Sequence, residues 1–153
     1  MSEEDLQRAI DVSLATASPL TRRIYANERW SAARVQRFVN RVMGATVATV
    51  RADGRPHAAV VLAACREGTV YFAASRGSLL LRTLERHTAI AMTVADRDHD
   101  LTIQGEAERV GRASAVPNLL RDLRGLSRRG QFTPEGWDGY LYSVRIERLF
   151  LSR

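Results

Sequence analysis

Apolar positions near the start of the chain recur with a helical period. Residues 3–15 place leucine or isoleucine at every fourth position, which predicts one apolar face of a helix. A second helix is predicted from Ser31, a suitable N-cap, and its end is predicted at Gly44. Residues 16–29, with a proline and two adjacent arginines, are expected to form the linker between these two helices.

From Gly44 onward the period changes to two, and short apolar runs are separated by turn residues. An Asp-Gly pair between two such runs is a strong hairpin signal, and Gly105 is a candidate β-bulge. Ser78 is a suitable N-cap for a short helix after the third run. The pattern predicts strands at 45–50, 56–65, 69–75, 88–96, 98–110 and 140–151, and helices at 76–87 and 115–129.

This order predicts a mainly β fold. About six antiparallel strands with one short crossover helix favour a small closed or split barrel with peripheral helices, because closure removes exposed strand edges. A length of 153 residues suits one domain. Within it we expect an N-terminal helix and linker at 1–30 and a split-barrel domain at 31–153.

Composition narrows the classes of partner. The net charge is +6, and all 23 basic residues are arginine. These arginines are scattered among carboxylates and aromatic residues are few, which favours a solvated arginine-rich surface over a nucleic-acid site. A non-enzymatic regulatory dimer that touches nucleic acid through the arginines of 121–129 remains an alternative. It predicts a steep salt dependence of DNA binding.

The sequence also indicates where the protein works. The N-terminus is acidic and lacks the apolar segment of a signal peptide, and no run is long enough to span a membrane. The single cysteine, Cys65, is expected to be a small core residue in a reducing compartment. We therefore expect a cytoplasmic protein with no membrane partner. The three histidines lack zinc-ligand spacing, so no metal site is expected.

Polar residues beside the first predicted turn are candidates for chemistry. Asp53 and Gly54 are explained by the turn itself, but Arg55 and His57 share one strand face at the root of the next strand. On the residues alone, a solvated turn arginine and a rim histidine are the favoured interpretation, and a ligand site is the alternative. Thr49, on the preceding strand, is expected only to fill a β position.

Several stretches together resemble a known family. They are VATVRADGRP (47–56), GTVYF (68–72), SLLLRTL (78–84) and LTIQGEAERV (101–110). In order and spacing they resemble the pyridoxamine 5'-phosphate oxidase-like flavin-binding split barrels. That superfamily includes FMN enzymes and reductases that use the F-420-type deazaflavin coenzyme.

The resemblance implies a six-stranded split-barrel homodimer with its cofactor, FMN or a deazaflavin, in a cleft at the dimer interface. It implies that strand residues hold the ring and that the start of the short helix holds the phosphate. Leu80 stands where the family usually has a phosphate-binding lysine, and Arg55, Arg76 and Arg51 are candidate replacements for it. The implied cofactor-binding residues are Arg55, His57, Ala59, Ala74, Ser75, Ser78, Leu80 and Arg82.

Two hypotheses of function follow from the resemblance. The first is an FMN- or deazaflavin-dependent oxidoreductase that transfers hydride to a small conjugated or heteroaromatic substrate, with no catalytic side chain assigned. The second is a non-catalytic split-barrel protein that carries a flavin, haem or apolar ligand, or binds no cofactor, because its phosphate site is degenerate. The apolar strand AAVVLAA (58–64) and the leucine at position 80 favour the second.

Overall fold

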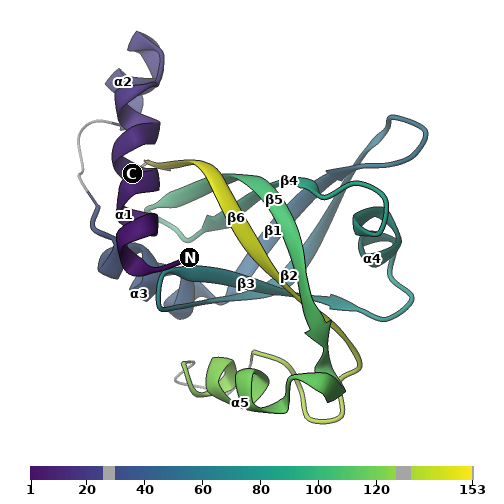
Figure 1. The fold of residues 1–153 in the computed structure, drawn as a ribbon. Coiled ribbons are helices and arrows are strands. Elements are labelled where there is room, and N and C mark those ends of the chain that lie inside the picture. Colours follow the sequence, from purple (N-terminus) through teal and green to yellow (C-terminus); the bar gives the residue numbers. More distant parts are fainter. Residues whose placement is uncertain (26–29, 127–131, 153) are drawn as a thin grey trace.

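Six antiparallel strands close into a barrel in the computed structural model, in the order β1-β2-β3-β6-β5-β4 (Figure 1). The structure describes residues 1–25, 30–126 and 132–152. The strands are β1 (Gly44–Val50), β2 (Pro56–Arg66), β3 (Thr69–Ser75), β4 (Ala89–Ala95), β5 (Asp100–Arg112) and β6 (Gly139–Ser152). The helices are α1 (Glu3–Ala15), α2 (Pro19–Tyr25), α3 (Ala32–Val42), α4 (Leu79–Leu84) and α5 (Pro117–Gly125), with a 3-10 turn at Ala113–Ala115.

The six predicted strands and the mainly β barrel are confirmed. Each predicted strand coincides with an observed one to within about two residues at either end. The predicted bulge is also present, because the register between β5 and β6 shifts between Gln104 and Gly105. The barrel interior is filled by alternate strand residues, such as Val47, Phe72 and Met92, none of which is exposed.

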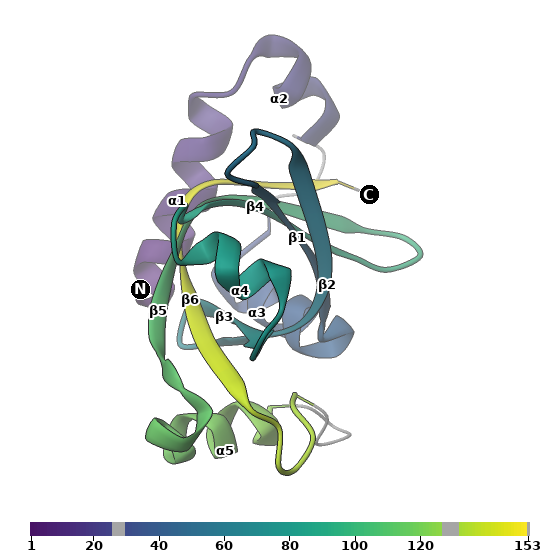
Figure 2. The same ribbon diagram turned by 90° about the vertical axis from the view of Figure 1, so that its right-hand side faces the viewer.

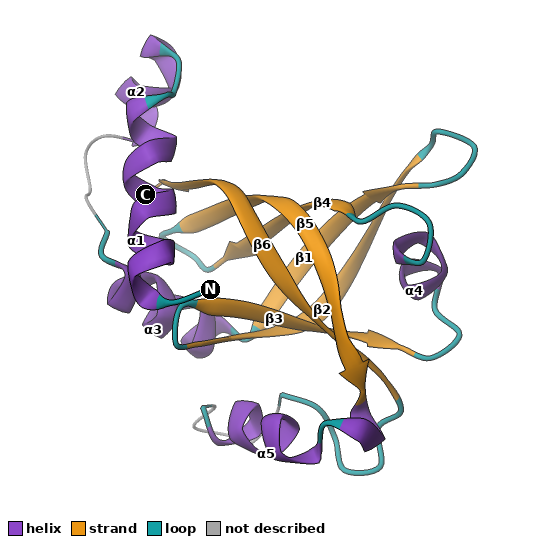
Figure 3. Ribbon diagram, viewed as in Figure 1, coloured by secondary structure: helices purple, strands orange, loops and turns teal. Residues whose placement is uncertain are grey.

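Helices lie around the barrel and at its ends (Figure 3). Helix α1 packs against β6 and α3, and its Leu6 and Ile10 join the same apolar core as the barrel strands. Helix α4 lies across the opposite end of the barrel, where Figure 2 shows it in front of the strands. Helix α5 packs through Leu120 and Leu123 onto a second apolar cluster on the outer surface.

Two expectations about the N-terminal region were wrong. Residues 16–29 are not only a linker, because α2 forms within them, with the Ser18 hydroxyl accepting a hydrogen bond from the Thr21 amide at 3.1 Å. The end of α3 is not made by Gly44. Met43 adopts the left-handed conformation instead, at φ 57°, and its amide donates to the Val39 carbonyl.

A buried serine joins α1 to the last strand. The hydroxyl of Ser13, which is 1% exposed, donates to the Ala9 carbonyl at 2.6 Å and accepts from the Leu149 amide at 2.9 Å. The Leu149 amide lies just beyond the shift in register between β5 and β6. Ser13 therefore satisfies a buried backbone donor of the barrel.

Replacing Ser13 with alanine should lower the free energy of unfolding by about 2 kcal/mol, since it leaves the buried Leu149 amide without an acceptor. Urea denaturation measures this loss. The exposed Ser114 provides the matched control, because its replacement with alanine removes a hydroxyl that serves no buried group. Equal stabilities of the two variants would show that Ser13 does not hold α1 on the barrel.

Candidate functional site

The helix that crosses the end of the barrel is fixed by its own cap and by its leucines. The Ser78 hydroxyl accepts a hydrogen bond from the Leu81 amide at 3.1 Å, so it serves as the N-cap of α4. Leu80, Leu81 and Leu84 point into the barrel core, and Leu80 is only 3% exposed. Arg82, on the opposite side of the helix, is exposed. The four-residue apolar spacing thus seals the barrel end and leaves the polar face outward.

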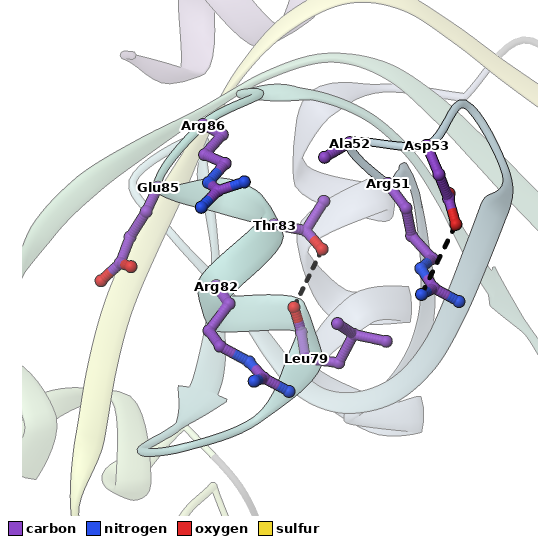
Figure 4. A pocket seen from close by; sticks show the side chains of 8 residues that line it. All are labelled: Arg51, Ala52, Asp53, Leu79, Arg82, Thr83, Glu85 and Arg86. Carbon is purple, nitrogen blue, oxygen red and sulfur yellow. Dashed lines mark hydrogen bonds and ion pairs between the residues drawn. The ribbon is translucent and has the colours of Figure 1, made fainter.

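A pocket of about 460 Å³ lies between α4 and the β1–β2 turn (Figure 4). Arg51, Ala52 and Asp53 line it from the turn. Leu79, Arg82, Thr83, Glu85 and Arg86 line it from α4 and the residues that follow. The pocket therefore combines three guanidinium groups with two carboxylates.

The carboxylates that line the pocket are already engaged. Asp53 pairs with Arg51 at 3.6 Å, and Glu85 pairs with Arg109 of β5 at 3.2 Å. Figure 4 shows the Glu85 side chain pointing away from the other lining side chains. Among the residues that the structure describes, the side chains of Arg82 and Arg86 have no carboxylate partner. The pocket is consequently electropositive.

Two polar side chains lie without partners on the strands below the turn. Thr49 and His57 are directly opposed in the register of β1 and β2, so their side chains share one face. Thr49 is 4% exposed, and neither its Oγ1 nor the buried Nδ1 of His57 has a hydrogen-bond partner in the described part of the chain. Thr49 precedes Arg51 by two residues, so the pair lies one step below the rim of the pocket. Buried unpaired polar groups are costly and call for an explanation.

The residues that the resemblance implied fall into three groups. His57 and Ala59 are half-buried on β2, and Arg55 lies exposed at its root, where its amide donates to the Asp53 carboxylate at 3.1 Å. Arg82 lines the pocket, whereas Ser78 caps its helix. The side chains of the third group pack in the core or bond another side chain of the protein.

That third group consists of Ala74, Ser75 and Leu80. Ala74 is 1% exposed and lies in the core with Leu80. The Ser75 hydroxyl is 3.1 Å from the Trp137 indole nitrogen, which donates to it. Leu80 therefore offers apolar packing and no charge at the position of the family's usual lysine.

Reasoning from the sequence did not single out Arg86 as a site residue. The spacing in the sequence could have indicated it, because Arg86 follows Arg82 by four residues. Residues at this spacing lie on the same side when the helical course continues past the end of α4. The Arg86 amide donates to the Thr83 carbonyl at 3.0 Å, so the helical course does continue. Thr49 was expected only to fill a β position, and its unpaired hydroxyl could not be read from the sequence.

A cluster of aromatic and arginine side chains borders the same end of the barrel. The Arg109 guanidinium lies 4.3 Å from the Tyr140 ring centroid and donates to the Tyr142 hydroxyl at 3.3 Å. Tyr142 in turn stacks on Phe72 in the core, with ring centroids 5.4 Å apart. Because Arg109 also holds Glu85, it links β5, β6 and the end of α4.

Asp138 joins two arginines beside this cluster. Its carboxylate accepts from Arg112 through both oxygens, at 3.1 and 2.9 Å, and from Arg76 at 3.3 Å. The hydrogen bond from Arg112 is the largest cause of a lowered pKa of Asp138, whose ordinary value is 3.8. The neighbouring residue, Trp137, is held to Ser75 of β3.

The lowered pKa of Asp138 sets the direction of a pH dependence. A carboxylate with a depressed folded-state pKa stabilises the fold fully above its ordinary value of 3.8, and this contribution is lost as the pH falls through the lower value. We expect the Trp137 indole NH resonance to shift in acid, below that ordinary value. Proton NMR measures the shift, and Asp138→Asn should remove the transition. A Trp137 signal that titrates identically in the variant would contradict the assignment.

The single cysteine lies in the core, as the sequence predicted. Cys65 is not exposed, and burial raises the pKa of its thiol to about 12. The two side-chain atoms of Asn40 hydrogen-bond the Cys65 backbone at 2.7 and 2.8 Å. In the ranges 1–25, 30–126 and 132–152 there is no cluster of three or more potential metal ligands. No helix in those ranges is long and apolar enough to cross a membrane.

The barrel with a helix across one end defines the class of split β-barrels. The family model of pyridoxamine 5'-phosphate oxidase matches residues 31–128, which is more than half of the chain. The chain therefore belongs to the pyridoxamine 5'-phosphate oxidase family. A search of curated protein sequences found no match.

Solved structures with the same fold include proteins of different described function. A protein of unknown function from Agrobacterium tumefaciens aligns with a TM-score of 0.64 and 22% identity, over 90% of this chain and 60% of its own. An F420 reductase aligns with a TM-score of 0.58 and 22% identity, over 73% of this chain and 92% of its own. The haem storage protein HutZ from Vibrio cholerae aligns with a TM-score of 0.55 and 18% identity, over 78% of this chain and 93% of its own. At these identities the likeness concerns the fold alone.

Proposed function

We propose that this protein binds a flavin-type cofactor, FMN or an F-420-type deazaflavin, at the α4 end of the barrel. The proposed activity is hydride transfer to a small conjugated or heteroaromatic substrate. The observation that supports the site is the opposed pair Thr49 and His57, whose buried Oγ1 and Nδ1 atoms lack partners. The polar edge of a flavin ring offers both carbonyl oxygens and ring nitrogens, which are suitable partners for such groups.

The residues present fit such a group in character. The ring itself supplies the hydride chemistry when it is bound. His57 and Thr49 would orient its polar edge, and the small Ala59 leaves room for a flat ring beside them. The arginines of the pocket match an anionic tail in charge. Bound against β2, the ring would be screened from water by α4 and its leucines.

We also propose that the protein acts as a homodimer through an outer surface of the barrel, the uncharged face. It comprises Thr46, Ala48, Val50, Ala58, Val60, Ala91 and Thr93. Thr46 is paired with both Val60 and Thr93, and Ala48 with both Ala58 and Ala91, so these side chains form one continuous patch. Val60 is 84% exposed and Val50 is 53% exposed, an exposure that favours a covered surface in solution.

The uncharged face ends beside the β1–β2 turn that carries Arg51, so a partner on it would border the pocket's end of the barrel. Replacing Val60 with arginine should convert the dimer to a monomer, because it buries two charges without partners in a symmetric contact. Light scattering after gel filtration measures the mass. Val12→Arg, at a 50% exposed valine of α1, is the control and should leave the mass unchanged. A mass unaffected by Val60→Arg would exclude this face as the interface.

A non-catalytic carrier is the second candidate, and one observation favours it. Leu80 is buried in the core and cannot provide the charge that a lysine would, and Ser78 is engaged as a cap. A phosphate site without its lysine is expected of a barrel that no longer uses a phosphorylated cofactor for turnover. The structure gives no comparable support to a nucleic-acid site, since the Arg124 guanidinium is bonded to the Thr133 and Pro134 carbonyls. Arg128 and Arg129 lie outside the described residues.

Titration of the purified protein with FMN and with the F-420-type deazaflavin, followed by fluorescence quenching, tests the proposal. Saturable quenching by one of them at micromolar concentration is the expected result. Reduction of the bound cofactor by a nicotinamide donor, followed by its reoxidation with a nitroaromatic or quinone acceptor, separates the oxidoreductase from the carrier. No quenching by either compound at high micromolar concentration would reject cofactor binding.

A further inference from the structure

The pocket beside α4 has cationic groups on two sides. Arg51 reaches it from the β1–β2 turn, whereas Arg82 and Arg86 reach it from α4 and the turn that follows (Figure 4). Leu79 also lines the pocket, between the two structural elements. Because these residues come from segments about 30 positions apart, folding alone brings the three guanidinium groups together.

Two of the three positive charges around this pocket, on Arg82 and Arg86, are left uncompensated by the described residues. Asp53 neutralises Arg51, and Glu85 is turned to Arg109, as described above. Arg82 of α4 and Arg86 of the turn that follows it therefore carry two positive charges four residues apart. Like charges at this spacing repel each other. An anion placed between them removes this repulsion, so binding it is favoured beyond the contacts themselves.

We propose that this pocket binds the phosphate group of the cofactor, in place of the start of α4. The inference deepens the proposed function and rests on it. The usual cradle lacks its lysine here, because Leu80 is an apolar residue in the core. The Ser78 hydroxyl accepts a hydrogen bond from the Leu81 amide and keeps only its own O–H to donate to a ligand. A phosphomonoester carries nearly two negative charges and several acceptor oxygens, which match two guanidinium forks.

Position along the strands connects the pocket with the ring site. Arg51 follows the last residue of β1, and its amide donates to the Arg55 carbonyl at 2.9 Å, so the pairing of β1 with β2 continues to this position. Because side chains alternate along a strand, Arg51 lies on the same face as Thr49, two residues before it. A ligand whose polar ring edge meets Thr49 and His57 would thus extend its tail toward Arg51. Arg82 and Arg86 lie on the helical side of that path.

Comparison of FMN with riboflavin, which lacks the phosphate, tests the assignment. The wild-type protein should bind FMN more tightly than riboflavin by about a hundredfold, roughly tenfold for each uncompensated arginine. Arg82→Gln combined with Arg86→Gln should abolish this preference while riboflavin affinity stays unchanged. Arg97→Gln, at an exposed arginine in the β4–β5 turn, is the matched control and should preserve it.

The outcomes separate the phosphate pocket from flavin binding itself. If FMN and riboflavin bind equally tightly to the wild-type protein, the phosphate assignment is wrong although flavin binding stands. A preference for FMN that survives in the double variant would place the phosphate elsewhere. If neither flavin binds, the proposed function fails for FMN, and calorimetry with pyrophosphate then decides on the pocket. Pyrophosphate binding that is lost in the double variant but kept in Arg97→Gln would support an anion site in this pocket. The absence of any heat of pyrophosphate binding to the wild-type protein would overturn it.

Discussion

Replacing Gly105 with alanine is expected to destabilise the protein by about 3 kcal/mol and to lower its melting temperature by about 10 °C. Gly105 is buried at the bulge where β5 shifts its register against β6. A Cβ atom there would lie 2.1 Å from the Arg145 carbonyl oxygen and 3.1 Å from its carbon. Backbone atoms of a paired strand cannot move aside as a side chain can, so the two strands must separate or slip.

Gly125, the last residue of α5, is the matched control for this substitution. A Cβ built on it meets nothing within 4 Å, so alanine there should leave stability unchanged or raise it by about 0.5 kcal/mol. Thermal unfolding followed by circular dichroism measures both variants. If Gly105→Ala melts at the wild-type temperature, β5 and β6 do not approach each other as the structure has them, and the barrel closure must be revised.

The second large effect concerns the unpaired polar pair below the pocket. Thr49→Val removes a buried hydroxyl without changing the shape of the side chain. It should stabilise the ligand-free protein by about 1 kcal/mol and weaken flavin binding by about tenfold, since the hydroxyl is costly when unpaired and useful when a ligand pairs with it. His57→Phe should act in the same two directions. Opposite changes in stability and affinity are typical of a binding group and not of a packing residue.

Denaturant unfolding and FMN titration on the same preparations measure the two quantities. Thr102→Val, at a half-buried threonine of β5, makes the same chemical change away from the pocket and should leave affinity unaltered. A Thr49→Val protein that is less stable than the wild type would mean that the hydroxyl is already satisfied in the free protein. Unchanged FMN affinity in both Thr49→Val and His57→Phe would remove the pair from the site.

The barrel was predictable because its signals are local. The Asp53–Gly54 turn, the period of two in the strands and the cap at Ser78 each depend on neighbouring residues. The helix α2 was missed because it has only seven residues and begins at the proline that was assigned to a linker. Its Leu20 and Ile24 stay exposed, so they add no buried face to the core. The end of α3 was misplaced because Met43, a residue that rarely adopts positive φ, took the role expected of the glycine beside it.

The candidate site was only partly predictable, because its residues are recognised by the absence of hydrogen-bond or ion-pair partners for their side chains. His57 and Arg82 were identified, but which side chains remain unpaired depends on contacts between distant segments. Glu85 is the example: it follows Arg82 closely in the sequence, yet it bonds Arg109 of β5. That contact leaves the positive charges of Arg82 and Arg86 without a carboxylate partner, and no local sequence pattern predicts it.

The crystal structure of the protein grown with saturating FMN is the most direct test of a flavin site at the α4 end of the barrel. We predict density for the ring with its polar edge within hydrogen-bond distance of His57 Nδ1 and Thr49 Oγ1, and the phosphate between Arg82 and Arg86. Flavin density bound elsewhere on the barrel, or a pocket that stays empty at saturating FMN while the protein is fully folded, would contradict the account.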